Sequence, residues 1–307
     1  MHTENNIMTC NFKDTFEYGE PEHDLPFIRA PRSNIAASGI MKYMRKIPME
    51  IPLLLGRKFC PGQSDQLILF IRDLAAMKQI LVTGARKSGK SALIRTMILG
   101  LVHGFSMRRL RLIIMAENDE FDWCKNLPHI KEPVIREPEK ILDRLADCVG
   151  EIGRREKVFA QNNLPNISTY NKGAFRRWIS SKIGGGAGTE WIMPYLIVII
   201  DGLSDLLLPV HKEKVESLLE EISLRGPAAG VHWIISTRRT RGYISRSFSD
   251  DVPVTLQLVS GTFAFDDGPA FETRYVNNVH FPFDPDELEY PGEIRELLSC
   301  YSRKLRT

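Results

Sequence analysis

Short apolar runs alternate with helical patterns along most of the chain after residue 50. Five runs have the length of buried strands: 79–83 (QILVT), 110–115 (LRLIIM), 195–200 (YLIVII), 232–236 (HWIIS) and 254–258 (VTLQL). Residues 90–103, 138–160 and 211–224 between them have helical spacing, and Gly226 and Pro227 are expected to end the last helix. This alternation predicts an α/β fold with a mainly parallel central sheet flanked by helices.

The pattern divides the chain into three regions. Residues 1–50 are polar and punctuated by proline, which predicts an extended N-terminal arm with a short helix near 33–45. Residues 51–265 carry the alternating pattern and form the expected domain, within which the glycine-rich residues 180–189 predict a surface loop. Residues 266–307 are expected to form a C-terminal extension with a terminal helix.

Composition adds little to this picture but excludes some classes of protein. The formal charge of the 307 residues is only +3, so any nucleic-acid contact must be local. The five cysteines stand singly and the histidines lack metal-ligand spacing, which favours a reduced, cytoplasmic protein without structural zinc. No apolar run approaches the roughly 18 residues of a membrane span.

The strongest motif is GARKSGKS at residues 84–91, which fits the phosphate-loop pattern GxxxxGK[ST] and lies between an expected strand and an expected helix. In such a loop the backbone N–H groups cradle phosphates, Lys90 reaches the β- and γ-phosphates, and the Ser91 hydroxyl binds Mg²⁺. The sequence thus predicts an ATP–Mg²⁺ site whose nucleotide-binding residues are Gly84, Ala85, Arg86, Lys87, Ser88, Gly89, Lys90, Ser91 and Ala92.

A second motif supplies the carboxylate that such a site requires. Asp201 ends the most apolar run (YLIVIID). This is the position of a Walker B aspartate, which holds the Mg²⁺ shell. Gly202 follows it, where many ATPases place the glutamate that activates water. The catalytic base is therefore the open question of the sequence.

Several segments together resemble the motor domain of FtsK/SpoIIIE-type DNA translocases, in consistent order over residues 50–260. They are 51–57 (IPLLLGR), 72–91, 126–130 (NLPHI), 151–171 with its Glu–Arg–Arg and Tyr–Asn elements, 194–207 and 227–240 (PAAGVHWIISTRRT). The resemblance implies a RecA-like P-loop ATPase that forms a homo-oligomeric, six-membered ring and couples ATP hydrolysis to movement on double-stranded DNA, independently of sequence.

The chain departs from the pattern of that family at several positions. Gly202 stands for the family's glutamate, Arg238 for the glutamine of its sensor segment, and Pro227 for an arginine. Residues 116–118 replace an Asp–Pro–Lys element. These departures leave an alternative open, in which the chain binds nucleotide without turnover and serves as a scaffold or regulatory partner of an active translocase or secretion complex.

Two hypotheses follow for the remaining site residues. Glu117, after the strand at 110–115, is expected to orient the attacking water, the alternative being a solvated loop acid. Thr237 is the expected sensor of phosphate or water, completing a catalytic set with Lys90, Asp201 and Glu117. The cluster of basic residues and a tyrosine that follows Thr237 is expected to contact the DNA backbone, the alternative being a solvated basic loop. The cluster consists of Arg238, Arg239, Arg241, Tyr243 and Arg246.

Overall fold

The computed structural model describes residues 49–59, 66–86, 88–174, 192–203, 208–238, 255–259 and 262–266, with short strands elsewhere. The strands are β1 (Met8–Thr9), β2 (Glu17–Gly19), β3 (Phe27–Pro31), β4 (Pro52–Phe59), β5 (Gln66–Asp73), β6 (Ile80–Gly84), β7 (Leu110–Ala116), β8 (Tyr195–Asp201), β9 (Val231–Thr237), β10 (Thr255–Val259), β11 (Thr262–Asp266) and β12 (Val279–His280). The helices are α2 (Leu74–Met77), α3 (Lys90–Gly104), η2 (Asp119–Asn126), α4 (Pro138–Gln161) and α7 (Leu208–Ala229).

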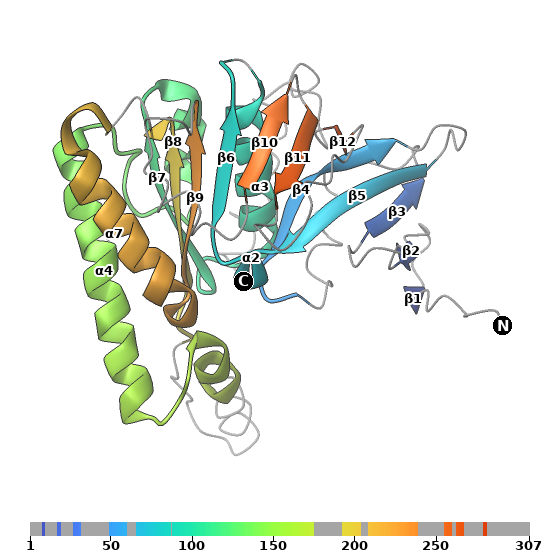
Figure 1. Cartoon of the computed structure of the whole chain (residues 1–307). Helices are drawn as coiled ribbons and strands as arrows, with labels where there is room; N and C mark the ends of the chain where they lie inside the picture. The colour runs from blue at the N-terminus through green and yellow to red at the C-terminus, as the bar shows by residue number, and fades with distance from the viewer. Residues whose placement is uncertain are drawn as a thin grey trace.

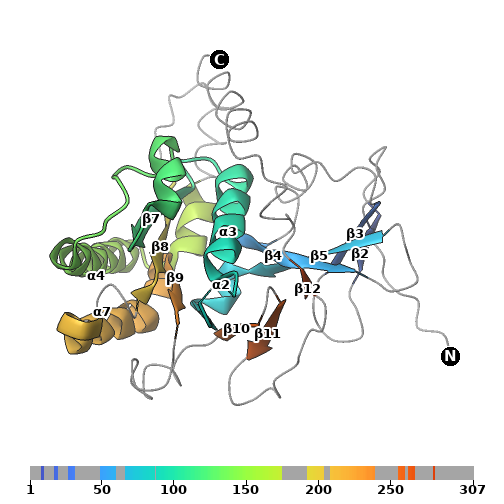
Figure 2. The same cartoon turned by 90° about the horizontal axis from the view of Figure 1, so that it is seen from above.

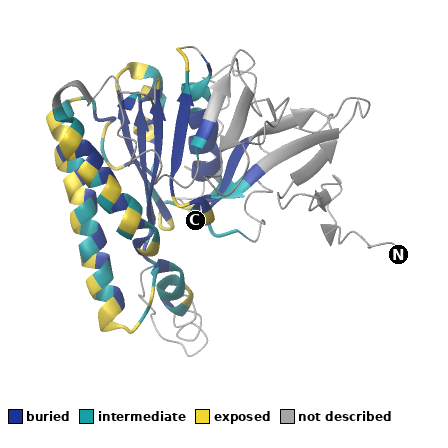
Figure 3. Ribbon diagram, viewed as in Figure 1, coloured by how far each residue is buried: buried dark blue, intermediate teal, exposed yellow. Residues whose placement is uncertain are grey.

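The central sheet has the strand order β11-β10-β6-β9-β8-β7 and is parallel from β10 to β7, with β11 antiparallel at one edge. Its strands β6, β7, β8 and β9 are almost entirely buried, as expected for parallel strands covered on both faces (Figure 3). The predicted α/β class and the five predicted strands are confirmed. The strand β9 lies between β6 and β8, so the two nucleotide motifs are not on adjacent strands.

Helices cover the two faces of this sheet in separate layers (Figures 1 and 2). The face toward α3 packs Leu93, Ile94 and Met97 against strand residues and against Ile51 and Leu53 of the segment that leads into β4. The opposite face packs α4 and α7, which lie side by side. Their outer surfaces are polar and exposed (Figure 3). Among the described residues, no helix is long and apolar enough to cross a bilayer.

The helix α7 differs from its sequence prediction at both ends. It begins at Leu208, is kinked at His211, and continues past Gly226 and Pro227 to Ala229. The prediction that Gly226 and Pro227 end the helix was therefore wrong. Pro227 lies in the last turn, and the Ser223 carbonyl that its missing N–H leaves without a helical donor accepts from the Gln79 side-chain amide at 3.0 Å. The chain turns instead at Gly230, whose φ is 73°.

The N-terminal region contributes strands to a second sheet, with the order β1-β2-β3-β5-β4-β12. In it β3 pairs antiparallel with β5, so the boundary expected at residue 50 separates strands of one sheet. The sequence missed this because such pairing joins segments some 40 residues apart, for example Phe27 with Phe70. The helices expected near 33–45 and at the C-terminus, and the loop at 180–189, lie outside the described residues.

Candidate functional site

The phosphate loop joins the end of β6 to the start of α3, as the sequence predicted. Gly89 precedes α3 with φ 98° and ψ 11°, a left-handed backbone that favours glycine. This turn directs the unpaired N–H groups of the first turn of a 15-residue helix toward the loop. The loop therefore has the backbone geometry of an anion site at a helix N-terminus. Lys87 lies outside the described residues.

Lys90 and Ser88 supply the polar groups inside the loop. The Lys90 ammonium donates to the carbonyls of Gly84 and Ala85, at 2.9 and 2.7 Å, so the loop curls around it. The Ser88 hydroxyl is buried and has no hydrogen-bond partner among the described residues. A buried hydroxyl without a partner is costly, and phosphate oxygens would accept its hydrogen bond. The exposed Ala85 and Arg86 form the outer rim of the loop.

The two nucleotide motifs meet through side chains 110 residues apart in sequence. The Ser91 hydroxyl donates to the Asp201 carboxylate at 2.9 Å. Ser236, at the end of β9, donates to the other carboxylate oxygen and accepts from the Gly202 N–H at 3.0 Å. Ser236 thus holds Asp201 in place, which the sequence analysis missed. The parallel pairing of Ile200 with Ile235 extends to these two residues and was the signal that could have revealed it.

Burial raises the pKa of Asp201 above its ordinary value, and the hydrogen bonds from Ser236 and Ser91 oppose that shift. The negative charge of Glu120 raises the pKa further, and the positive charge of Lys90 lowers it. A cation shared by the Ser91 and Asp201 oxygens would favour the ionised carboxylate. The hydroxyl–carboxylate pair, the lysine and the buried Ser88 hydroxyl together fit Mg²⁺ and the phosphates of a nucleotide.

Glu117 and Arg238 come together at the same end of the sheet, although they follow strands that are not adjacent. The Arg238 guanidinium lies 3.7 Å from the Glu117 carboxylate, and both side chains are partly exposed. Thr237, the other expected sensor residue, is fully buried beside the last residues of β6, where it pairs with Thr83. The rest of the predicted DNA-contact group, Arg239, Arg241, Tyr243 and Arg246, lies outside the described residues.

The segment after β7 is held by arginines from two other elements. Arg95 on α3 pairs with Glu120 at 3.3 Å, and Arg136 donates to the Asn118 carbonyl and pairs with Asp122. Arg95 lies one helical turn after Ser91, so Glu120 is held on the side of the sheet that carries the phosphate loop. The sequence analysis did not predict this anchoring of Glu120.

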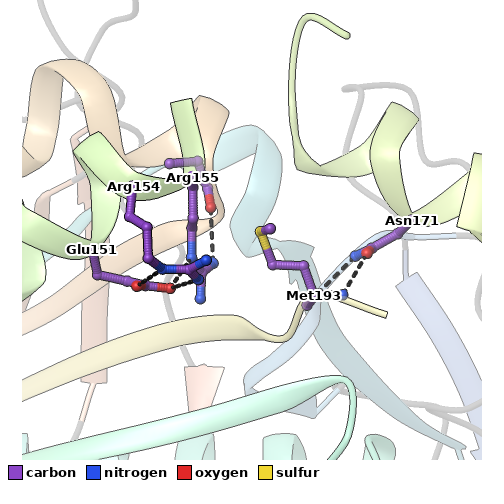
Figure 4. Close-up of polar contacts among 6 residues, drawn as sticks. Glu151, Arg154, Arg155, Asn171 and Met193 are labelled. Carbon is purple, nitrogen blue, oxygen red and sulfur yellow. Dashed lines mark hydrogen bonds and ion pairs between the residues drawn. The ribbon is translucent and has the colours of Figure 1, made fainter. Parts of the chain in front are cut away.

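The Glu–Arg–Arg and Tyr–Asn elements have structural contacts away from the loop (Figure 4). Arg155 is buried and donates to Glu151 at 2.7 Å and to the Ala229 carbonyl at the end of α7 at 2.9 Å. The Asn171 amide exchanges two hydrogen bonds with the backbone of Met193, at 2.9 and 2.8 Å. These contacts fix α4 against α7 and position the entry to β8.

The comparisons with known proteins agree with this geometry. The sequence pattern of the FtsK/SpoIIIE family matches residues 42–242. The chain is 32% identical to the DNA translocase FtsK of Clostridium tetani over 170 residues, which are 55% of this chain and 21% of the translocase. It is 30% identical to the FtsK of Lactiplantibacillus plantarum over 193 residues, 62% of this chain and 22% of that one. The chain therefore spans about a fifth of the length of these relatives.

Solved structures show the same fold at lower identity. ATPases 2 and 3 of EssC from Geobacillus thermodenitrificans align with a TM-score of 0.59 and 16% identity, over 83% of this chain and 49% of that one. The pCW3 conjugation coupling protein TcpA, solved with ATPγS, aligns with a TM-score of 0.55 and 18% identity, over 93% of both chains. Both comparisons confirm the P-loop ATPase fold.

Proposed function

Because the chain belongs to the FtsK/SpoIIIE family, we propose that it is the motor domain of a DNA translocase, which hydrolyses ATP to move along double-stranded DNA. It acts in the cytoplasm as a ring of identical subunits, six by resemblance. The observation that carries the proposal is the hydrogen bond between Ser91 and Asp201, which joins the phosphate loop to the end of β8. The named translocases among its relatives support DNA as the substrate.

Each described site residue has a role in this proposal. Lys90 and the loop backbone bind the phosphates, and Ser91 with Asp201 holds Mg²⁺, which when bound offsets negative charge on the phosphates. Thr237 contacts the γ-phosphate or the attacking water. Glu117 orients that water, since Gly202 has no side chain to do so. The basic residues that follow Arg238, which are Arg239, Arg241 and Arg246, contact the DNA backbone without reading its sequence.

A second candidate function rests on Gly202 and Arg238, which replace the family's glutamate and glutamine. In that candidate the chain binds ATP without turnover and regulates an active translocase. A third candidate keeps the motor but moves protein. It is suggested by another structural relative, EccC of Thermomonospora curvata, which is named as a type VII secretion ATPase. Salt-sensitive binding of double-stranded DNA would exclude this third candidate.

The test is steady-state ATP hydrolysis with and without double-stranded DNA. The unsubstituted chain is expected to show DNA-stimulated turnover that Lys90→Ala abolishes. Lys140→Ala is the matched control, because Lys140 is an exposed lysine of α4 that pairs only with Glu137 among the described contacts. Glu117→Gln is expected to lower kcat by about 10²–10⁴ while ATP still binds.

The outcomes separate the candidate functions. ATP binding without turnover in the unsubstituted chain would favour the regulatory subunit. Hydrolysis that survives intact in Glu117→Gln would refute the role of Glu117 and leave the motor assignment standing.

A further inference from the structure

Three departures from the family pattern meet at one place in the structure. The pairing of Ala116 with Asp201, and of Ile200 with Ile235, places the residues that follow at the same level on β7, β8 and β9. These residues are Glu117, Gly202 and the Thr237–Arg238 pair. Motif spacing and periodicity do not reveal that they are neighbours, because they come from segments more than 30 residues apart.

The ion pair between Glu117 and Arg238 crosses the end of β8. The strands β7 and β9 are separated by β8, hence by about 10 Å at the usual strand spacing. Gly202, at the end of β8, has a φ of 85° and no side chain. Gly202 therefore places no side chain between the guanidinium and the carboxylate of the pair. In the family, the glutamate that follows the Walker B aspartate occupies this position.

Arg238 also lies beside the phosphate loop. β9 is the neighbour of β6, and Thr237 pairs with Thr83, so Arg238 is level with Gly84, the first residue of the loop. The backbone of Arg238 thus lies next to the loop, while its guanidinium reaches toward Glu117. Guanidinium groups bind carboxylates and phosphates with the same planar array of donors, so a phosphate competes directly with Glu117 for this side chain.

The pair itself contributes little to folding. The two side chains are 41% and 50% exposed, and their closest atoms are 3.7 Å apart. Exposed ion pairs of this kind are weak and are easily exchanged. The contact can therefore break when a stronger anion is present, without disturbing the sheet.

We propose that Arg238 is a positioning residue that binds Glu117 in the absence of a γ-phosphate and binds the γ-phosphate when ATP is present. The exchange releases the Glu117 carboxylate toward water in the space over Gly202. Turnover then requires both residues, and the Glu117 carboxylate stays paired with Arg238 until ATP is bound. This inference deepens the proposed function, and its consequence for turnover rests on that function. Its consequence for nucleotide affinity can be measured without turnover.

The experiment measures the affinities for ATPγS and for ADP by titration calorimetry and compares their ratio between variants. Arg238→Ala is expected to lower the preference for ATPγS over ADP by about 10-fold or more, because a charged hydrogen bond to the γ-phosphate is lost. Glu117→Gln is expected to leave that preference unchanged or raise it, because a competitor for Arg238 is removed. Arg238→Lys should retain part of the preference.

Arg154→Ala is the matched control. Arg154 is an exposed arginine of α4 that pairs with Glu151 away from the phosphate loop, and its removal should not change the ratio. An unchanged ratio in Arg238→Ala overturns the inference, and so does a fall in Glu117→Gln comparable to that in Arg238→Ala. If the unsubstituted chain shows DNA-stimulated turnover and either of these results is found, the exchange of Arg238 between Glu117 and the γ-phosphate is overturned and the proposed function stands. Failure of the unsubstituted chain to bind ATPγS refutes the proposed function as well.

Discussion

Gly230, between α7 and β9, provides the sharpest test of the packing that positions the sensor strand. Its φ is 73°, and a Cβ added there would lie 2.3 Å from Ile167 Cδ1 and 3.0 Å from Tyr195 Cδ1. Gly150, in the middle of α4, is the matched control, because a Cβ there meets no atom within 4 Å. The two alanine substitutions are chemically identical and differ only in backbone conformation and surroundings.

The expected magnitudes follow from those surroundings. At Gly230 an alanine costs about 1–2 kcal/mol for the left-handed backbone and about 1–3 kcal/mol for the overlap with Ile167. It regains about 0.4–1 kcal/mol through the unfolded chain, which leaves a net destabilisation of about 1–5 kcal/mol. At Gly150 an alanine in a helix interior stabilises by about 0.5–1 kcal/mol.

Equilibrium urea unfolding, followed by tryptophan fluorescence, measures both effects. Trp233 is fully buried on β9 and reports the sheet next to the substituted turn. The midpoint of Gly230→Ala is expected well below that of the unsubstituted chain, and the midpoint of Gly150→Ala slightly above it. Equal midpoints for the two variants would refute the close packing of Gly230 against Ile167.

Three further predictions concern charge and backbone. Burial lowers the pKa of His232 to about 4, from an ordinary value of 6.5, so the unfolded state takes up the proton first on acidification. Stability should fall between pH 6.5 and 4 by at most about 3 kcal/mol, and urea midpoints of His232→Gln should fall less over that range. Arg155→Met should destabilise by about 3 kcal/mol, since it leaves the Ala229 carbonyl without its buried donor and removes one partner of Glu151. The exposed Arg154, which also pairs with Glu151, provides the thermal-melting control, and Arg154→Met is expected to change stability much less. Gly202→Ala should destabilise by about 1–2 kcal/mol, because its φ is 85°; a thermal midpoint equal to that of the unsubstituted chain would contradict this.

The local patterns determined most of the central domain. Apolar runs of strand length and the helical spacing between them predicted the five parallel strands and α3 and α4, because burial on both faces of a sheet restricts composition. The phosphate loop was also predictable, since the conformation of Gly89 and the spacing to Lys90 and Ser91 are properties of one short segment. Asp201 followed from its place at the end of the most apolar strand.

The tertiary structure decided the contacts between distant segments. It placed Ser236 on Asp201, Arg238 on Glu117 and Arg155 on the end of α7, and it joined β3 to β5. None of these can be read from periodicity, because strand order and register bring together residues whose separation in sequence is arbitrary. The sequence by itself therefore determined which chemistry the loop can perform. Only the tertiary structure decided which carboxylates and which arginine lie near the phosphate loop, because the ends of β7, β8 and β9 meet at one edge of a single sheet.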